Sequence, residues 1–164
     1  MYVTLVPVTL LLLSTADTDL LAARTIAAPA LPLRLANPSR VTDPVGLLDG
    51  VSLVVVRLLG GRRAWEGFQA LHAACLERRI PLVAVGGEGA VDAELADASS
   101  VPAGVVADAA AYLREGGPDN LGQLVAFLSD TVLLCTRCHR DVHDGRHALR
   151  LKDGRRLSPD GWSP

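Results

Sequence analysis

The chain has 164 residues, of which 49% are hydrophobic, and this composition predicts one domain with a sizeable core. With 21% charged residues and a formal net charge of -2, the protein has no strong field to attract nucleic acid or an anionic membrane. We therefore expect neither as a partner. Aromatic residues make up only 4% of the chain, which argues against recognition by base stacking.

The apolar residues 3–13 are interpreted as part of a buried strand and not as a signal peptide, because no Lys or Arg precedes them and an Asp-rich turn follows. No run reaches the ~18 apolar residues of a membrane-spanning helix. Three cysteines, two of them close together, do not make a disulfide scaffold, so we expect a protein of the reducing cytoplasm.

Four apolar runs are predicted as strands, at residues 8–13, 31–35, 53–56 and 82–85. Helical stretches separate or follow them, at residues up to about 26 and at 44–49, 62–79, 92–98, 103–114 and 120–134. The inner stripe of the 62–79 helix is expected to contain Trp65, Phe68, Ala70, Leu71, Cys75 and Leu76. Alternating strands and helices predict an α/β fold: a three-layer open parallel sheet of about four strands with additional C-terminal helices. Its strand order could be flavodoxin-like or Rossmann-like.

Polar residues follow the first predicted strand: Ser14, Thr15, Asp17, Thr18 and Asp19. Open α/β sheets bind their ligands at the carboxyl ends of the strands, so this hinge is a candidate binding edge. The alternative is a purely local role, in which Thr15 or Asp17 caps the following helix. From the residues alone, both interpretations remain open.

Three arginines and one glutamate extend this candidate edge. Arg57 ends the third strand, and Arg62 and Arg63 follow a pair of glycines. Guanidinium groups near one strand end suit carboxylate ligands, although a loop and a solvated helix start would explain them as well. Glu88 lies in residues 86–89, which lack the Lys and Ser/Thr of a Walker A loop and are interpreted mainly as a turn. The candidate substrate- or domain-contact edge thus comprises Ser14, Thr15, Asp17, Asp19, Arg57, Arg62, Arg63 and Glu88.

The composition changes near residue 134, so two units are expected, 1–134 and 135–164. In the second, Cys135, Cys138 and His139 form a Cys-x-x-Cys-His motif, and His143 follows. These four side chains could bind zinc, although one cysteine pair is half of a usual tetrahedral site. The motif also matches c-type haem attachment, which requires export. A polar tail with free thiols is the simpler interpretation.

Blocks over residues 10–134 resemble a known family: LLLLSTADTDLLAAR, LLDGVSLVVVRLLGGRRAWEGFQAL and VPAGVVADAAAYLREGGPDNLGQLVAFLSD. They are similar to the N-terminal segment of CobN-type large subunits of aerobic cobaltochelatase, relatives of the magnesium chelatase large subunit. In that family, the large subunit binds hydrogenobyrinic acid a,c-diamide and takes part in cobalt insertion for cobalamin biosynthesis. ATP hydrolysis by AAA-type motor subunits drives the reaction.

The resemblance implies a fragment, because the family proteins are many times longer. Its expected partners are the remaining domains of the large subunit, the motor subunits and the corrinoid precursor. Cobalt and ATP belong to the complete complex, and no cofactor or catalytic residue is expected in this chain. No cobalt or tetrapyrrole ligand can be carried over to these residues.

A second resemblance covers VLLCTRCHRDVHDGRHALRLKDGRRLSPDGW, which is similar to the end of an actinobacterial HNH endonuclease. It implies that Cys135 and Cys138 form one zinc pair, that His143 is the last histidine of the motif, and that a paired strand follows. The upstream zinc pair and the general base are missing. The alternative functions are therefore a zinc-binding HNH-related protein acting on DNA, or a free-standing α/β binding module. A frameshift, a recombination or a gene-boundary error near residue 134 would explain the joined patterns.

Overall fold

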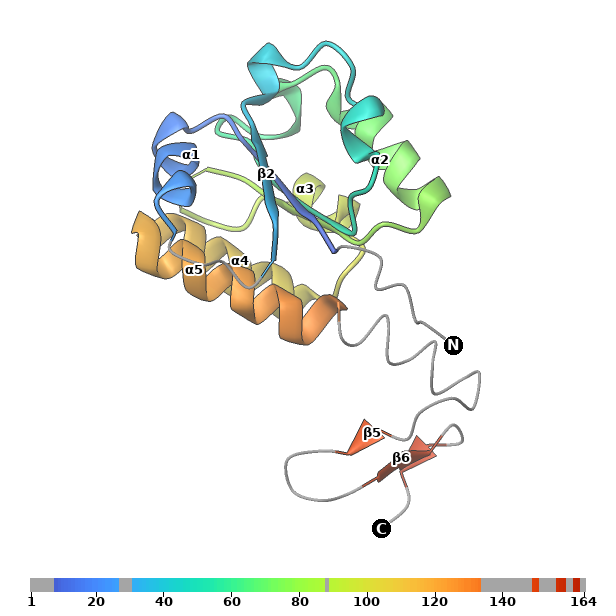
Figure 1. Ribbon diagram of the computed structural model, residues 1–164. Helices are drawn as coiled ribbons and strands as arrows, with labels where there is room; N and C mark the ends of the chain where they lie inside the picture. Colours follow the sequence, from blue (N-terminus) through green and yellow to red (C-terminus); the bar gives the residue numbers. More distant parts are fainter. Residues whose placement is uncertain are drawn as a thin grey trace.

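The computed structural model of the protein describes residues 8–26, 31–87, 89–133, 149–150, 156–158 and 161–162. Four strands form a parallel sheet in the order β2-β1-β3-β4 (Figure 1). They are β1 (Leu10–Ser14), β2 (Leu33–Ala36), β3 (Leu53–Arg57) and β4 (Leu82–Val85). The predicted α/β class is confirmed, and the order is the flavodoxin-like one, with its switch point between β1 and β3.

Helices cover both faces of this sheet. They are α1 (Asp17–Arg24), α2 (Phe68–Arg78), α3 (Ala93–Ala98), α4 (Ala103–Glu115) and α5 (Gly117–Leu128). Three short 3-10 turns, η1 (Pro38–Arg40), η2 (Gly46–Leu48) and η3 (Arg62–Ala64), lie between them, and a π-helical turn, η4 (Ser129–Leu133), continues α5. Helices α1, α4 and α5 pack on the face that contains Leu10 and Leu12. Helices α2 and α3 pack on the opposite face, against Leu11 and Leu13. Burial on both faces explains why the central strands are continuous apolar runs.

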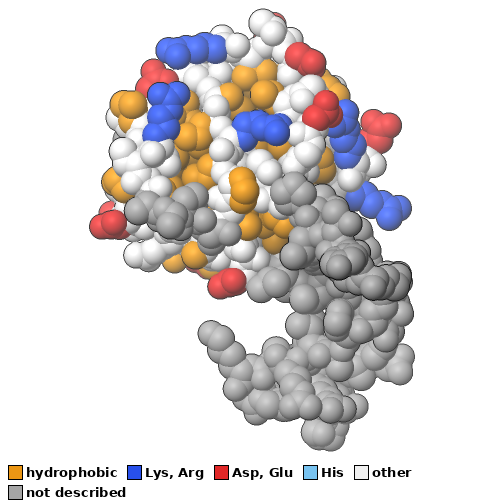
Figure 2. All heavy atoms as spheres, viewed as in Figure 1, with side chains coloured by type: hydrophobic (Ala, Val, Ile, Leu, Met, Phe, Trp, Pro, Cys, Tyr) orange, Lys and Arg blue, Asp and Glu red, His pale blue; other side chains and the backbone are white. Residues whose placement is uncertain are grey.

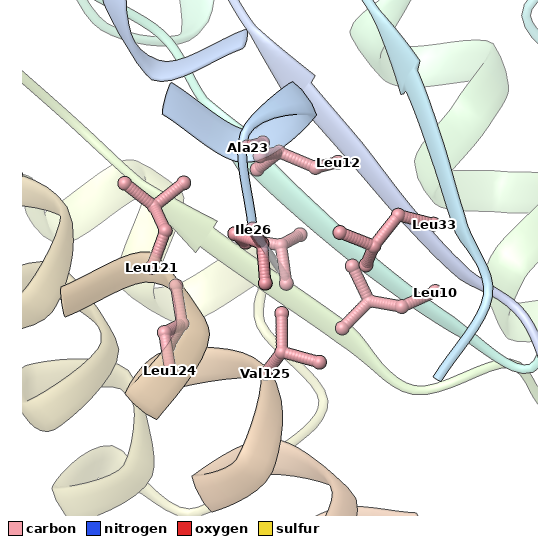
Figure 3. Close-up of a pocket in the computed structure, with 9 residues that line it drawn as sticks. Leu10, Leu12, Ala23, Ile26, Leu33, Leu121, Leu124 and Val125 are labelled. Carbon is pink, nitrogen blue, oxygen red and sulfur yellow. The ribbon is translucent and has the colours of Figure 1, made fainter. Parts of the chain in front are cut away.

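Helix α5 completes the first of these layers, through Leu121, Leu124 and Val125 (Figure 3). Their side chains approach those of Leu10 and Leu12 and leave an apolar space of about 10 Å³ between α1, α5 and the sheet. This volume is about that of one water probe and its lining is apolar, so the layers are closely packed here.

Some predicted helices have different bounds. Residues 62–79 contain the turn η3 and then α2, which begins at Phe68. Leu76 is 58% exposed, so its prediction as an inner residue is wrong, as is that of Ala70. The helix instead buries Leu71, Ala74 and Cys75. Residues 44–49 contain only the turn η2, and α5 begins three residues early because Pro118 is favoured in a first turn.

Three short strands form a second, antiparallel sheet in the order β5-β6-β7. They are β5 (Leu149–Arg150), β6 (Arg156–Ser158) and β7 (Gly161–Trp162). β5 pairs with β6 in antiparallel orientation, with Leu149 opposite Leu157 and Arg150 opposite Arg156. In the described part of the chain, no helix has the length and apolar character needed to cross a bilayer.

Candidate functional site

The switch point of the sheet contains a buried ion pair. Ser14 and Arg57 lie side by side at the ends of β1 and β3, and Asp19 reaches them from the first turns of α1. The exposed fractions of Ser14, Asp19 and Arg57 are 0%, 4% and 7%. Arg57 Nη1 donates to Asp19 Oδ1 at 2.9 Å and Oδ2 at 3.0 Å, and Ser14 Oγ donates to Asp19 Oδ2 at 2.7 Å. We name these three residues the buried triad.

The buried triad is closed by a carbonyl from a distant helix. Arg57 Nη1 also donates to the backbone oxygen of Leu113, near the end of α4, at 2.9 Å. The guanidinium therefore connects β3, α1 and α4. A buried charge is costly unless it is paired and hydrogen-bonded, and here the carboxylate and the carbonyl meet both needs. The crevice that flavodoxin-like sheets offer to ligands is occupied at this point by the protein's own side chains.

Thr15 connects the ends of two strands. Its backbone N–H donates to Arg57 O at 3.1 Å, and its Oγ1 accepts from the backbone N–H of Leu59 at 2.9 Å. The residue that precedes α1 is Ala16, and no side chain caps this helix. The prediction that Thr15 or Asp17 caps the helix is therefore wrong. The Thr15 hydroxyl is instead occupied by the loop that follows β3.

The other predicted edge residues lie outside the buried triad. Asp17 is exposed, and its Oδ1 accepts from Asn37 Nδ2 at 2.9 Å, which links α1 to the end of β2. Arg62 and Arg63 are exposed on η3, and the guanidinium carbon of Arg62 lies 6.0 Å from the centre of the Phe68 ring. Glu88 lies outside the described residues. The participation of this edge in substrate or domain contact stays a prediction.

Asp92 is a further polar residue of this edge. It caps α3, because its Oδ1 accepts from the backbone N–H of Leu95 at 3.0 Å. The loops after β3 and β4 both approach it: a Cβ placed on Gly61 would lie 2.8 Å from Asp92 Oδ2, and one on Gly86 would lie 2.9 Å from its Cβ. An Asp at a predicted helix start was a usable signal for the cap. Nothing in the sequence indicated that two glycine-containing loops would pack around it.

The structure also contains an open groove that the sequence did not predict. It has a volume of about 430 Å³ and lies between α1 and the end of β2. Its lining residues are Asp17, Leu20, Leu21, Arg24, Leu35, Ala36, Asn37, Arg40 and Val41. We name it the α1–β2 groove. A second, mainly apolar hollow of about 440 Å³ lies between the end of α2, the start of α4 and η4.

Cys75 is buried on the inner side of α2, and desolvation raises the pKa of its thiol from the ordinary 9.0 to about 11, with partial opposition from the Arg78 charge. Within the ranges that the structure describes, no three or more His, Cys, Asp or Glu residues are grouped to hold a metal ion. The predicted zinc ligands Cys135, Cys138, His139 and His143 lie outside those ranges.

Comparisons with known proteins point to one kind of relative. The aerobic cobaltochelatase subunit CobN of Pseudomonas aeruginosa is 31% identical over 139 residues, which cover 77% of this chain and 11% of that protein. The solved catalytic subunit of cobaltochelatase from Mycobacterium tuberculosis is 49% identical, with a TM-score of 0.68, over 77% of this chain and 10% of that one. No family model matches the chain. Over most of its length, the chain is thus homologous to a segment of CobN, and it spans about a tenth of the length of these relatives.

Proposed function

We propose that this chain is a partial cobaltochelatase large subunit that contributes an N-terminal flavodoxin-like domain and has no catalytic activity alone. In the complete enzyme, the large subunit would bind hydrogenobyrinic acid a,c-diamide and take part in ATP-dependent cobalt insertion in the cytoplasm. The remaining domains and the AAA-type motor subunits would supply the rest of the machinery. Cobalt is a substrate in this scheme.

One observation carries the proposal: 49% identity and a TM-score of 0.68 to the catalytic subunit of a cobaltochelatase, over 77% of this chain. Agreement in both sequence and fold over most of the described α/β unit is stronger support than the fold alone, since this fold serves many functions. We infer the non-catalytic role from the length of the match, because the matched segment covers only 10% of that subunit. The buried triad supports it as well, since its charged groups are engaged within the fold.

A domain exchange tests the proposal. Residues 8–133 would replace the matching segment of a full-length large subunit, and cobalt insertion would be measured with motor subunits, ATP, cobalt and the corrinoid precursor. We expect the chimera to retain activity and an unrelated flavodoxin-like domain in the same place to abolish it. The 164-residue chain with motor subunits should insert no cobalt. An inactive but folded chimera would argue against the proposed function, and activity of the chain alone would refute the non-catalytic role.

For the predicted edge, we propose that the exposed Arg62 and Arg63 make the contact with substrate or a neighbouring domain, while the buried triad holds the edge in shape. Two arginines near one strand end suit carboxylates, whether these belong to the substrate or to a neighbouring domain. In the chimera, Arg62→Glu with Arg63→Glu should raise the KM for the corrinoid if the contact is with substrate. If the contact is with a neighbouring domain, the same substitutions should instead weaken assembly of the large subunit and leave the KM unchanged. If neither value changes, the edge has no such role.

We propose that residues 135–164 are a separate unit, because β5, β6 and β7 belong to a sheet of their own. Metal analysis tests the zinc-binding alternative for this unit. One zinc per chain, lost in the variant Cys135→Ser with Cys138→Ser, would favour an HNH-related protein. Absence of zinc from the purified chain would remove the basis for that alternative.

A further inference from the structure

The two edges of the parallel sheet differ in how their backbone groups are satisfied. At β4, Leu82 N donates to Ser100 Oγ at 2.8 Å, and Ala84 N donates to Ser99 Oγ at 2.8 Å. Leu82 O accepts from the backbone N–H of Ser100 at 2.9 Å. The segment after α3 therefore covers this edge, as proteins commonly do to prevent pairing with another strand.

β2 has no comparable cover within the described residues. The hydrogen bonds between β1 and β2 start with the one from Leu10 N to Pro32 O, at 3.0 Å. In the parallel register observed, every second residue of β2 therefore bonds to β1. The intervening Leu33 and Leu35 direct their N–H and C=O groups away from β1. No hydrogen bond connects these groups to another described segment. All four residues of β2 are only partly buried.

The α1–β2 groove adjoins this edge and has a basic rim. Leu35 and Ala36 of β2 line it opposite Leu20 and Leu21, and Leu21 is 59% exposed. Hydrophobic side chains gather with basic ones on the face over β2 and α1 (Figure 2).

Two arginines line the groove, Arg24 and Arg40. Arg24 and Arg40 are exposed, and neither has an ion-pair partner among the described residues. The acidic residue of the lining, Asp17, already accepts a hydrogen bond from Asn37. The lining therefore combines apolar side chains with two arginines and one carboxylate, and its excess positive charge suits an acidic partner.

We propose that the β2 margin, defined as the open edge of β2 together with the α1–β2 groove, docks an extended acidic segment of another part of a CobN-length subunit. This inference rests on the proposed function, which supplies such a partner. Main-chain bonds to Leu33 and Leu35 would provide affinity, as in other cases of strand addition. Apolar side chains of the segment would enter the groove, and its carboxylates would pair with Arg24 and Arg40.

Peptide binding tests the inference on the complete chain. The probe is a short peptide of alternating valine and glutamate, titrated by calorimetry and compared with its valine–lysine counterpart. We expect saturable binding of the glutamate peptide and much weaker binding of the lysine peptide. A glutamate peptide with alternate backbone nitrogens methylated should lose binding, because it cannot donate to a strand edge. Arg24→Glu and Arg40→Glu should each weaken binding about fivefold, whereas Arg114→Glu, an exposed control on α4 with the same charge change, should have no effect.

Several outcomes would overturn the docking proposal. These are no binding of any peptide, equal binding of the two charge types, or full binding of the methylated peptide. A concentration-dependent dimer that the peptide does not dissociate would assign the margin to a second copy of this chain and would also overturn it. The chimera distinguishes the two proposals. Cobalt insertion without peptide binding rejects the docking site alone, and peptide binding with an inactive chimera rejects the proposed function alone.

Discussion

At the centre of the sheet, Ser14, Asp19 and Arg57 are buried and bonded to one another, whereas at its β2 margin the exposed Asp17, Arg24 and Arg40 line an open groove. Both sets combine carboxylates with arginines, and both involve α1. The two carboxylates differ in their position on α1. Asp17 and Asp19 are two residues apart, which places them on different sides of a helix. Residue type therefore indicates polarity at this end of the sheet, and helix phase decides which polar groups are available.

The largest expected effect comes from breaking the buried triad. Asp19→Ala leaves the Arg57 guanidinium buried without its carboxylate, and loss of one partner of such a pair costs about 3 to 5 kcal/mol. Urea unfolding would measure the loss of free energy of unfolding. Asp17→Ala is the matched control in the same helix; it loses only an exposed hydrogen bond to Asn37 and should cost about 1 kcal/mol. Equal losses for the two variants would show that Asp19 contributes no more than an exposed carboxylate.

Truncation within the layer under α5 should have the next largest effect. Leu124 is 3% exposed and packs with α1 and the sheet, so Leu124→Ala should lower the free energy of unfolding by about 2 to 5 kcal/mol. Leu21→Ala, at the open groove, is the control and should cost far less because Leu21 is 59% exposed. Chemical denaturation of both variants measures the difference. Similar costs would contradict the contrast between a packed centre and an open margin.

Removing the cover of the β4 edge should cost less. Ser99→Ala leaves the backbone N–H of Ala84 without its 2.8 Å partner, and an unsatisfied buried donor costs about 1 to 3 kcal/mol. Hydrogen exchange should show faster exchange at Ala84. Ser39→Ala, whose hydroxyl bonds at the surface, serves as the control. Unchanged exchange at Ala84 would indicate that water replaces the hydroxyl.

Burial should also control the chemistry of Cys75. Its pKa of about 11 predicts slow reaction with a disulfide reagent at mildly alkaline pH in the folded protein, and fast reaction in urea. The measurement uses a chain carrying Cys135→Ser and Cys138→Ser, so that one thiol is followed. Because the folded pKa is raised above the ordinary 9.0, the stability from the neutral thiol is complete below that pH and is lost as pH rises toward 11. Equal rates in both states would contradict this.

The smallest effect on stability is expected at the open margin. Arg24→Glu and Arg40→Glu change exposed side chains, and each should shift the free energy of unfolding by less than about 0.5 kcal/mol. Thermal unfolding measures this shift for the same variants that should weaken peptide binding. A large loss of stability would show that these arginines support the fold instead of forming a free surface.

The positions of the strands of the parallel sheet could be predicted from the sequence, because continuous apolar runs such as residues 53–56 have few alternatives to a strand buried on both faces. The sequence also located Ser14 and Arg57 at the same end of the sheet, since each ends a parallel strand. Helix bounds were less accurate. Residues 62–67 have only weak helix signals, and the structure has a short turn there instead of the start of the helix. The helix α2 also has a different inner face from the predicted one, because it buries Ala74 and exposes Leu76.

Which polar residues are enclosed depends on contacts between segments that are far apart in the sequence. The carbonyl of Leu113 closes the buried triad from 56 residues beyond Arg57, a contact that no local pattern encodes. In the same way, Ser99 and Ser100 cover β4 while no described segment covers β2. Burial and the satisfaction of backbone groups depend on segments that meet only after folding. For this reason one predicted polar edge became a closed centre beside an open margin.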